Sequence, residues 1–157
     1  ASGVAVIRVG AATEVEMIEK KHRVEDALEA VRAARMEGIV PGGGCALLAA
    51  RELAHIKIEH PEQAHGVNAV FEALAEPIRQ MAENAGLSAD LTLSRVMEVQ
   101  KKNSSASVGY NFRTGKLENL QEAGIIDPVK VTISALRNAA SVASTLLTTN
   151  YAIVEEE

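Results

Sequence analysis

The clearest pattern of apolar and polar positions lies between Thr13 and Glu37, a stretch without proline or glycine. Apolar side chains recur there at steps of three and four residues: Val24, Ala27, Leu28, Val31 and Ala34. This spacing places them on one face of an amphipathic helix, which would be roughly 36 Å long at 1.5 Å per residue. Thr13 is a suitable N-cap. We therefore predict one long helix over 13–37.

Two shorter stretches near the chain ends have β-rich composition. Residues 4–9 are apolar at nearly every position, which is typical of a strand covered on both faces. Residues 151–154 have a similar composition. We expect a buried strand at 4–9 and a final strand at 151–154.

Glycine and proline interrupt the helical pattern after the long helix. Gly38 and the run Pro41–Gly44 favour turns and unusual backbone dihedrals. Beyond them, helical spacing of apolar positions returns at 46–56, 67–74 and 78–82, and Pro77 suits the first turn of the third of these helices. Ser88 can cap a further helix through Met97. We place a domain boundary at Gly38, between the segments 1–37 and 38–157.

The last third of the chain predicts a hairpin and another long helix. Val108–Asn111 is β-like, and Thr114-Gly115 forms a plausible turn after it. Asp127 can cap a final helix that has Pro128 at its first position and continues to Leu147. The predicted fold class is mainly α with small β elements.

Composition narrows the range of functions. The chain has 157 residues, 47% of them apolar, and no tryptophan, which suits one ordinary domain with an aliphatic core. Its net charge of -5 is spread along the sequence without a basic stripe, which argues against nucleic acid as a partner. No apolar run approaches the ~20 residues that span a bilayer. The single cysteine, Cys45, is expected to be a buried, inert thiol in a reducing compartment.

Local chemistry gives the candidate site residues structural interpretations as well. Asp26 points away from the apolar stripe of its helix and could pair with Arg23 or His22. Three successive glycines, 42–44, could cradle an anion but more often form a hinge or tight turn. Asn111 suits a turn, and Asp127 a helix cap. The four histidines lack metal-ligand spacing, so no metal site is predicted.

Six stretches, in order along the chain, resemble the C-terminal half of a group I (GroEL-type) chaperonin subunit. They are Val4–Met17, Arg23–Leu28, Gly38–Gly44, Gly109–Asn111, Gly124–Thr132 and Ala139–Ala143. The resemblance implies that 1–37 is part of an intermediate, hinge domain and that 38–157 is the C-terminal half of a helical equatorial domain that binds ATP. We expect the chain to be a fragment, because it begins at Ala1 and contains no Gly-Asp-Gly-Thr-Thr phosphate loop.

The resemblance also implies roles for single residues. Asp26 matches the aspartate that positions the attacking water, a task suited to a carboxylate. Gly43 matches a glycine whose backbone approaches the ribose and base, and Asn111 an asparagine that reads adenine. Asp127 would take the ribose hydroxyls, with Ile125 packed against the base. Two small residues usually follow the asparagine, but Phe112 and Arg113 stand here, and they would either stack on the base or crowd it.

At the level of the whole protein, the resemblance implies a cytoplasmic, ring-forming chaperonin that uses ATP with Mg²⁺ to refold proteins. Its partners would be unfolded clients, identical subunits and a co-chaperonin. The isolated chain is expected to be inactive as an ATPase, because the phosphate-binding half is absent from it. The alternative is a truncated or divergent paralogue that does not hydrolyse ATP and acts as an assembly scaffold.

Overall fold

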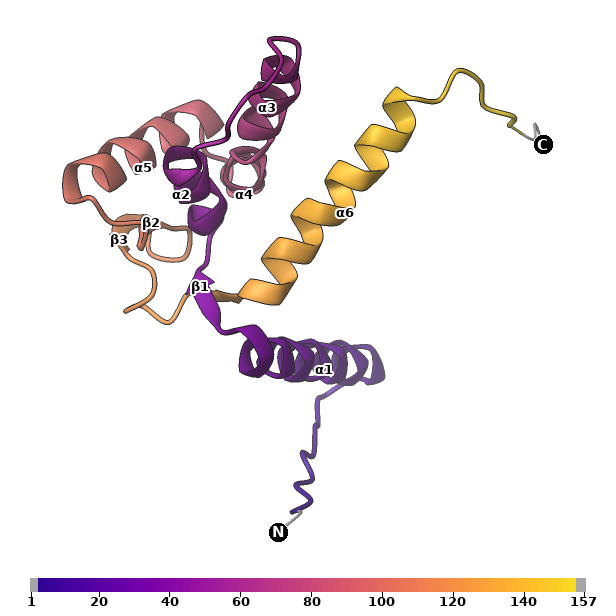
Figure 1. Ribbon diagram of the computed structural model, residues 1–157. Helices are drawn as coiled ribbons and strands as arrows, with labels where there is room; N and C mark the ends of the chain where they lie inside the picture. Colours follow the sequence, from indigo (N-terminus) through magenta and orange to yellow (C-terminus); the bar gives the residue numbers. More distant parts are fainter. Residues whose placement is uncertain (1–2, 155–157) are drawn as a thin grey trace.

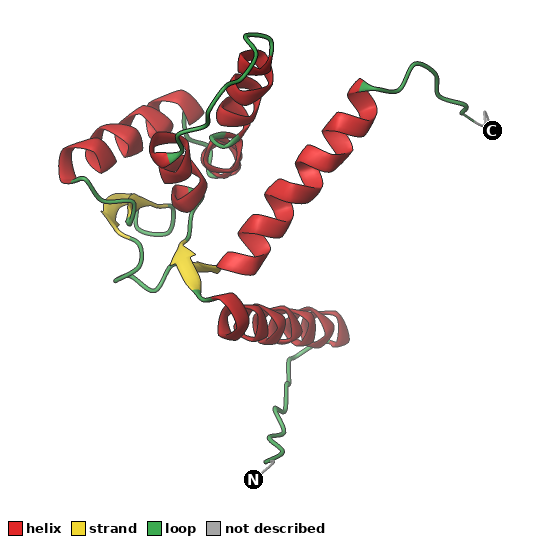
Figure 2. Ribbon diagram, viewed as in Figure 1, coloured by secondary structure: helices red, strands yellow, loops and turns green. Residues whose placement is uncertain are grey.

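The computed structural model describes residues 3–154, which form mostly helix with a few short strands (Figure 2). The helices are α1 (Glu14–Glu37), α2 (Cys45–Leu53), α3 (Gln63–Ala73), α4 (Glu76–Asn84), α5 (Ala89–Asn103) and α6 (Val129–Leu147). The strands are β1 (Ile39–Pro41), β2 (Val108–Asn111), β3 (Lys116–Asn119) and β4 (Ile126–Pro128). The predicted fold class is therefore confirmed.

Helix α1 begins and ends where its sequence predicts. The hydroxyl of Thr13 accepts a hydrogen bond from the N–H of Glu16 at 3.3 Å, which satisfies one of the free donors at the helix start. Gly38 ends the helix with φ 87°, a dihedral that favours glycine, and its N–H donates to the carbonyl of Ala34 at 2.8 Å. The backbone can therefore leave the helix sharply and enter β1.

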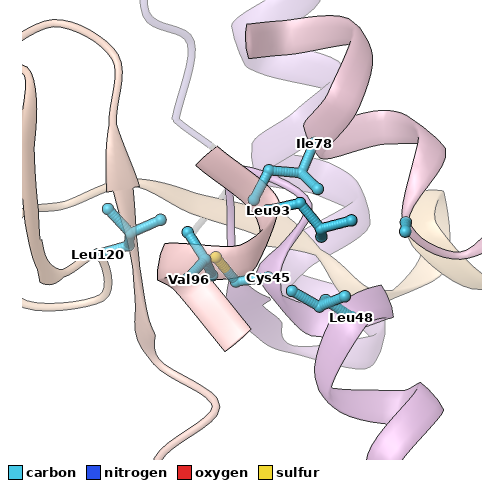
Figure 3. Packing of buried hydrophobic residues seen from close by; sticks show 7 residues of the cluster. Cys45, Leu48, Ile78, Leu93, Val96 and Leu120 are labelled. Carbon is cyan, nitrogen blue, oxygen red and sulfur yellow. The ribbon is translucent and has the colours of Figure 1, made fainter. Parts of the chain in front are cut away.

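A cluster of buried side chains holds together α2, α4, α5 and the β2–β3 hairpin (Figure 3). Its members are Cys45, Leu48, Ala75, Ile78, Leu93, Val96 and Leu120. Burying one aliphatic side chain contributes about 1.5–3 kcal/mol relative to leaving it in water. None of the described residues of α1, α3 or α6 is buried. This cluster is therefore the core of the described chain.

Residues 3–154 form two antiparallel strand pairs, one between neighbouring segments and one between distant parts of the sequence. Strands β2 and β3 form a hairpin, whereas β1 pairs with β4, so that Val40 lies opposite Asp127. The N–H of Val129 then donates to the carbonyl of Gly38 at 3.1 Å. Helix α6 leaves this strand pair and packs against α1, while it extends away from the α2–α5 cluster (Figure 1). The β1–β4 pair is thus the junction between α1, α6 and the core.

The two strands predicted near the chain ends are not formed. Residues 4–9 and 151–154 are irregular, and Val4 and Ile153 are 93% and 100% exposed. A strand needs a neighbour for its N–H and C=O groups, and residues 3–154 contain no strand beside either segment. The predicted helix at 46–56 also ends early, at Leu53.

Candidate functional site

The glycine run between β1 and α2 is shaped by close backbone contacts. The N–H of Gly42 donates to the carbonyl of Ile125 at 3.0 Å, and a Cβ at residue 42 would lie 3.2 Å from that carbonyl. Gly43 and Gly44 have φ values of 66° and 75°. A Cβ at Gly43 would be 2.9 Å from Leu120 and 4.0 Å from the carbonyl of Tyr110. Both dihedral and space therefore require glycine, and the loop touches the segments that lead to Asn111 and Asp127.

Asp127 lies in β4, where it is half-buried opposite Val40. Burial raises the pKa of its carboxyl above the ordinary value, because the charged form loses hydration. Among residues 3–154, no hydrogen bond or ion pair reaches this carboxylate. It is a partly desolvated acceptor that a ligand hydroxyl can satisfy.

The prediction that Asp127 caps the last helix is wrong. Helix α6 begins at Val129, and Pro128 occupies the N-cap position without a side-chain cap bond. Residues 126–128 pair with β1 and form a strand. Asp127 therefore lies one residue before the N-cap position. Only a side chain at the N-cap is placed to bond the N–H groups of the first turn. The carboxylate is therefore free of the structural role that its position before proline suggests.

The Asn111 side chain is almost fully buried, at 6% exposure, and belongs to the tip of the β2–β3 hairpin. Its Oδ1 accepts the backbone N–H groups of Arg113 at 2.9 Å and Thr114 at 3.3 Å, and its Nδ2 donates to Glu118. The structural interpretation as a turn residue is therefore confirmed. The family-implied contact with adenine remains a prediction.

Phe112 and Arg113 occupy the turn that follows Asn111. The Phe112 ring packs edge-on against Tyr110, with ring centroids 5.0 Å apart, and contacts the buried cluster. Arg113 is exposed. The aromatic ring is therefore engaged by the protein itself, and the guanidinium is the more accessible of the two groups.

Ile125 lies between the glycine run and the core. It is half-buried, packs against the buried cluster, and its N–H donates to the carbonyl of Leu120 at 2.8 Å. The candidate nucleoside-binding residues thus come from three segments that contact one another through Leu120 and the β1–β4 pair. These residues are Gly43, Asn111–Arg113, Ile125 and Asp127.

Asp26 is placed apart from these residues, on the exposed surface of α1. It lines an open depression whose other residues all belong to the same helix: Glu25, Leu28, Glu29 and Arg32. Arg23 bonds Glu19 instead, so the predicted pairing of Asp26 with Arg23 is not formed. Roughly 17 Å of helix separates Asp26 from the end of α1 at 1.5 Å per residue.

Glu118 is the residue of this region that sequence reasoning missed. Its Oε1 accepts from the Asn111 amide and from the Thr114 hydroxyl, the latter at 3.3 Å. The register of the hairpin was the available signal. With the turn at Thr114-Gly115, Glu118 lies opposite Gly109. Gly109 is two residues before Asn111 on the same strand, so Glu118 and Asn111 share one face of the hairpin.

The prediction that Cys45 is a buried thiol is confirmed. The thiol is fully buried, and burial, together with the nearby Asp127 carboxylate, raises its pKa to about 11. No group of three or more potential metal-ligating side chains occurs in residues 3–154. In the same range, no helix has the length and apolarity needed to cross a membrane.

Comparison with known proteins identifies the class of molecule to which this helical architecture belongs. All residues, 1–157, match the TCP-1/cpn60 chaperonin family. The chain belongs to this family. It is also similar to a solved structure described as a group III chaperonin in the open state, with 33% identity and a TM-score of 0.74. The match covers 92% of this chain and 30% of that one.

Proposed function

We propose that this chain forms part of a group I-type chaperonin subunit that binds and hydrolyses ATP in a ring and assists the refolding of unfolded polypeptides. Membership of the chaperonin family supports the assignment. The observation that carries the ATP site is the convergence of the glycine run on the segments of Asn111 and Asp127, with a half-buried carboxylate left without a partner among residues 3–154.

In this proposal the chain contributes the nucleoside part of the ATP site. The ribose hydroxyls donate to Asp127, whose carboxylate regains the hydrogen bonds that burial removed. In the proposal the backbone of Gly43 approaches the sugar, and glycine is required at this position because a Cβ would lie 2.9 Å from Leu120. Ile125 offers an apolar contact to the base. The triphosphate and Mg²⁺ would be held by other parts of the subunit, since the described residues contain no cluster of carboxylates that could ligate a metal.

Asp26 has the catalytic role in the proposal. Its carboxylate would accept a hydrogen bond from the attacking water and orient it toward the γ-phosphate. Because Asp26 sits on α1, apart from the glycine run, hydrolysis requires α1 to move toward the nucleotide. Gly38 is a suitable hinge, since it ends α1 with a positive φ and a Cβ at this position would meet no atom within 4 Å.

The proposed partners are unfolded client proteins, identical subunits and a co-chaperonin in the cytoplasm. The group I assignment rests on the motifs Gly38–Gly44 and Gly124–Thr132, whereas the similar solved structure is described as a group III chaperonin. Stimulation of refolding by a separate co-chaperonin is the property that would support the group I assignment.

A second candidate is a paralogue that keeps the chaperonin scaffold without hydrolysing ATP. The observation in its favour is the hairpin tip, where Phe112 packs on Tyr110 and the Asn111 amide is bonded within the turn. Such a protein would still assemble with other subunits, but the absence of phosphate release would distinguish it.

The test compares ATP binding with single-turnover phosphate release in an assembled subunit that contains this chain. Asp26→Ala should leave ATP affinity nearly unchanged and slow hydrolysis strongly, because the carboxylate acts on water and not on the bound nucleotide. Glu29→Ala, one turn further along the same helix face, is the matched control and should hydrolyse at the normal rate. Normal hydrolysis by Asp26→Ala would remove Asp26 from the mechanism, and failure of the unsubstituted subunit to hydrolyse ATP would favour the scaffold.

A further inference from the structure

The backbone of Leu120 links the three segments that carry the candidate nucleoside-binding residues. Leu120 directly follows β3, and none of its surface is exposed. Its N–H donates to the carbonyl of Ser107, just before β2, at 2.9 Å. Its own carbonyl accepts the N–H of Ile125 at 2.8 Å, and the Ile125 carbonyl accepts the N–H of Gly42 at 3.0 Å. Leu120 therefore joins the hairpin to the segment of Asp127 and, through Ile125, to the glycine run.

The side chain of Leu120 joins the same segments from inside the buried cluster (Figure 3). Its Cδ1 would be 2.9 Å from a Cβ at Gly43 and 2.6 Å from a Cβ at Gly109. Beyond the chain neighbours of Gly43, no other side chain in the described range 3–154 comes within 4 Å of that first Cβ position. The remaining neighbour is the backbone carbonyl of Tyr110, at 4.0 Å. This δ-methyl group is therefore the side-chain contact between the glycine run and β2.

We propose that Leu120 is a positioning residue of the nucleoside site: its δ-methyl group holds the glycine run at the distance from the hairpin that a bound nucleoside needs. The inference rests on the proposed function, in which the backbone of Gly43 approaches the sugar. Glycine has more backbone freedom than any other residue, so three in succession keep one path only where neighbours pack against them. Without the methyl group, binding would also have to order this loop, which weakens affinity. Leu120 thus acts through Gly43 and does not touch the nucleotide.

A stability measurement on two substitutions tests the contact itself. Leu120→Val shortens the side chain by one carbon and so withdraws both δ-methyl groups, while the position stays apolar. Gly43→Ala strains a backbone that has φ 66°, and its Cβ also meets the Leu120 Cδ1. Only the strain remains when residue 120 is valine, so Gly43→Ala should lower the urea midpoint less in that background than in the wild-type chain. Equal shifts in the two backgrounds would overturn the inference, because the methyl group would then not hold the glycine run.

Nucleotide binding to the assembled subunit, measured by calorimetric titration, tests the positioning role. Leu120→Val should weaken the binding of ATP and of ADP by about three- to tenfold, the effect of one additional ordering step. The two losses should be equal, because the phosphates are held by other parts of the subunit. Single-turnover hydrolysis at saturating ATP should keep its rate, since the proposed action of Asp26 on water does not depend on this contact. A lower rate with unchanged affinity would contradict a role in positioning the nucleoside.

Leu48→Val is the matched control. Leu48 is also a fully buried leucine of the cluster, on the opposite side of it from Leu120 in Figure 3, and it does not reach the Cβ position of Gly43. Leu48→Val should lose a similar amount of stability and bind both nucleotides normally.

Leu120→Met should recover most of the affinity, because methionine is long and flexible enough to fill the space beside Gly43. The same affinity in Leu120→Val and Leu48→Val would overturn the role of Leu120 and leave the nucleoside site intact. Failure of the unsubstituted subunit to bind either nucleotide would overturn the proposed function as well.

Discussion

Gly109 of β2 lies directly against the thiol of Cys45 in α2. A Cβ built on Gly109 would be 2.1 Å from the Cys45 Sγ and 2.6 Å from Leu120. Real Cβ atoms do not approach other atoms this closely, so the strand and the helix meet only because residue 109 has no side chain. The contact ties the hairpin that carries Asn111 to the helix that follows the glycine run.

Gly109→Ala should therefore lower the free energy of unfolding by about 1–3 kcal/mol, the usual range for an overpacked core. The measurement is urea unfolding followed by circular dichroism. Cys45→Ala removes the sulfur, so Gly109→Ala should cost less in that background than in the wild-type chain. Costs that simply add would mean that Leu120, and not the thiol, sets the spacing.

Gly66→Ala is the matched control for the substitution of a glycine. Gly66 lies within α3, where a Cβ would meet no atom within 4 Å. Alanine is the better helix former, so this variant should be about 0.4–1 kcal/mol more stable. A loss of stability at both glycines would point to a general sensitivity of the chain and not to the Gly109–Cys45 contact.

The Cys45 thiol should be unreactive in the folded chain. With a pKa raised to about 11, roughly one thiol in a thousand is ionised at pH 8, and none of its surface is exposed. Modification by a disulfide reagent should be slow in buffer and fast in guanidinium. Similar rates in the two conditions would contradict the burial of this side chain.

Local sequence signals predicted the helices well. The hydroxyls of Thr13 and Ser88 cap α1 and α5, since each accepts the backbone N–H of the residue three positions further on. Pro77 lies in the first turn of α4. Each of these signals acts between near neighbours, so the sequence alone contains the relevant geometry. The hairpin turn at Thr114-Gly115 is of the same kind.

Long-range pairing was not predictable in this way. The β1–β4 pair joins residues almost ninety positions apart. Because of this pairing Asp127 lies in a strand and not at the N-cap of α6, which the local Asp127-Pro128 pattern does not indicate. Glu118 was missed for a related reason, since its partner Asn111 is identified only once the hairpin register is known. The prediction of a strand at 4–9 was wrong, because a β-rich composition does not show whether a neighbouring strand is present to pair with.

Ser88→Ala should destabilise the chain by about 1 kcal/mol, because the Ser88 hydroxyl accepts the N–H of Leu91 at the start of α5. Helix α5 contributes Leu93 and Val96 to the buried cluster, so fraying at its start weakens the core. Thermal unfolding of Ser88→Ala and Ser88→Asp compares the two, since aspartate caps about as well as serine. Equal losses in both variants would show that the hydroxyl is not acting as a cap.

Asp127→Asn should make the chain more stable at neutral pH, and the gain should disappear in acid. Burial raises the pKa of the Asp127 carboxyl above its ordinary value of 3.8. Between 3.8 and the raised value the folded state binds more protons than the unfolded state. The free energy of unfolding of the wild-type chain therefore falls as pH rises through this window.

Asparagine carries no charge at any of these pH values, so the Asp127→Asn variant does not lose free energy of unfolding as the pH rises. Urea unfolding of both proteins between about pH 3 and pH 8 should give a difference in stability that is near zero at the acid end, grows through the window and then levels off. Asp26→Asn, on the exposed face of α1, controls for the removal of one negative charge from the chain. A difference that is constant with pH would mean that folding does not shift the pKa of the Asp127 carboxyl, and one that grows toward acid would mean that a partner in the fold stabilises the carboxylate. It would then not be the unsatisfied acceptor to which the ribose hydroxyls are proposed to bind.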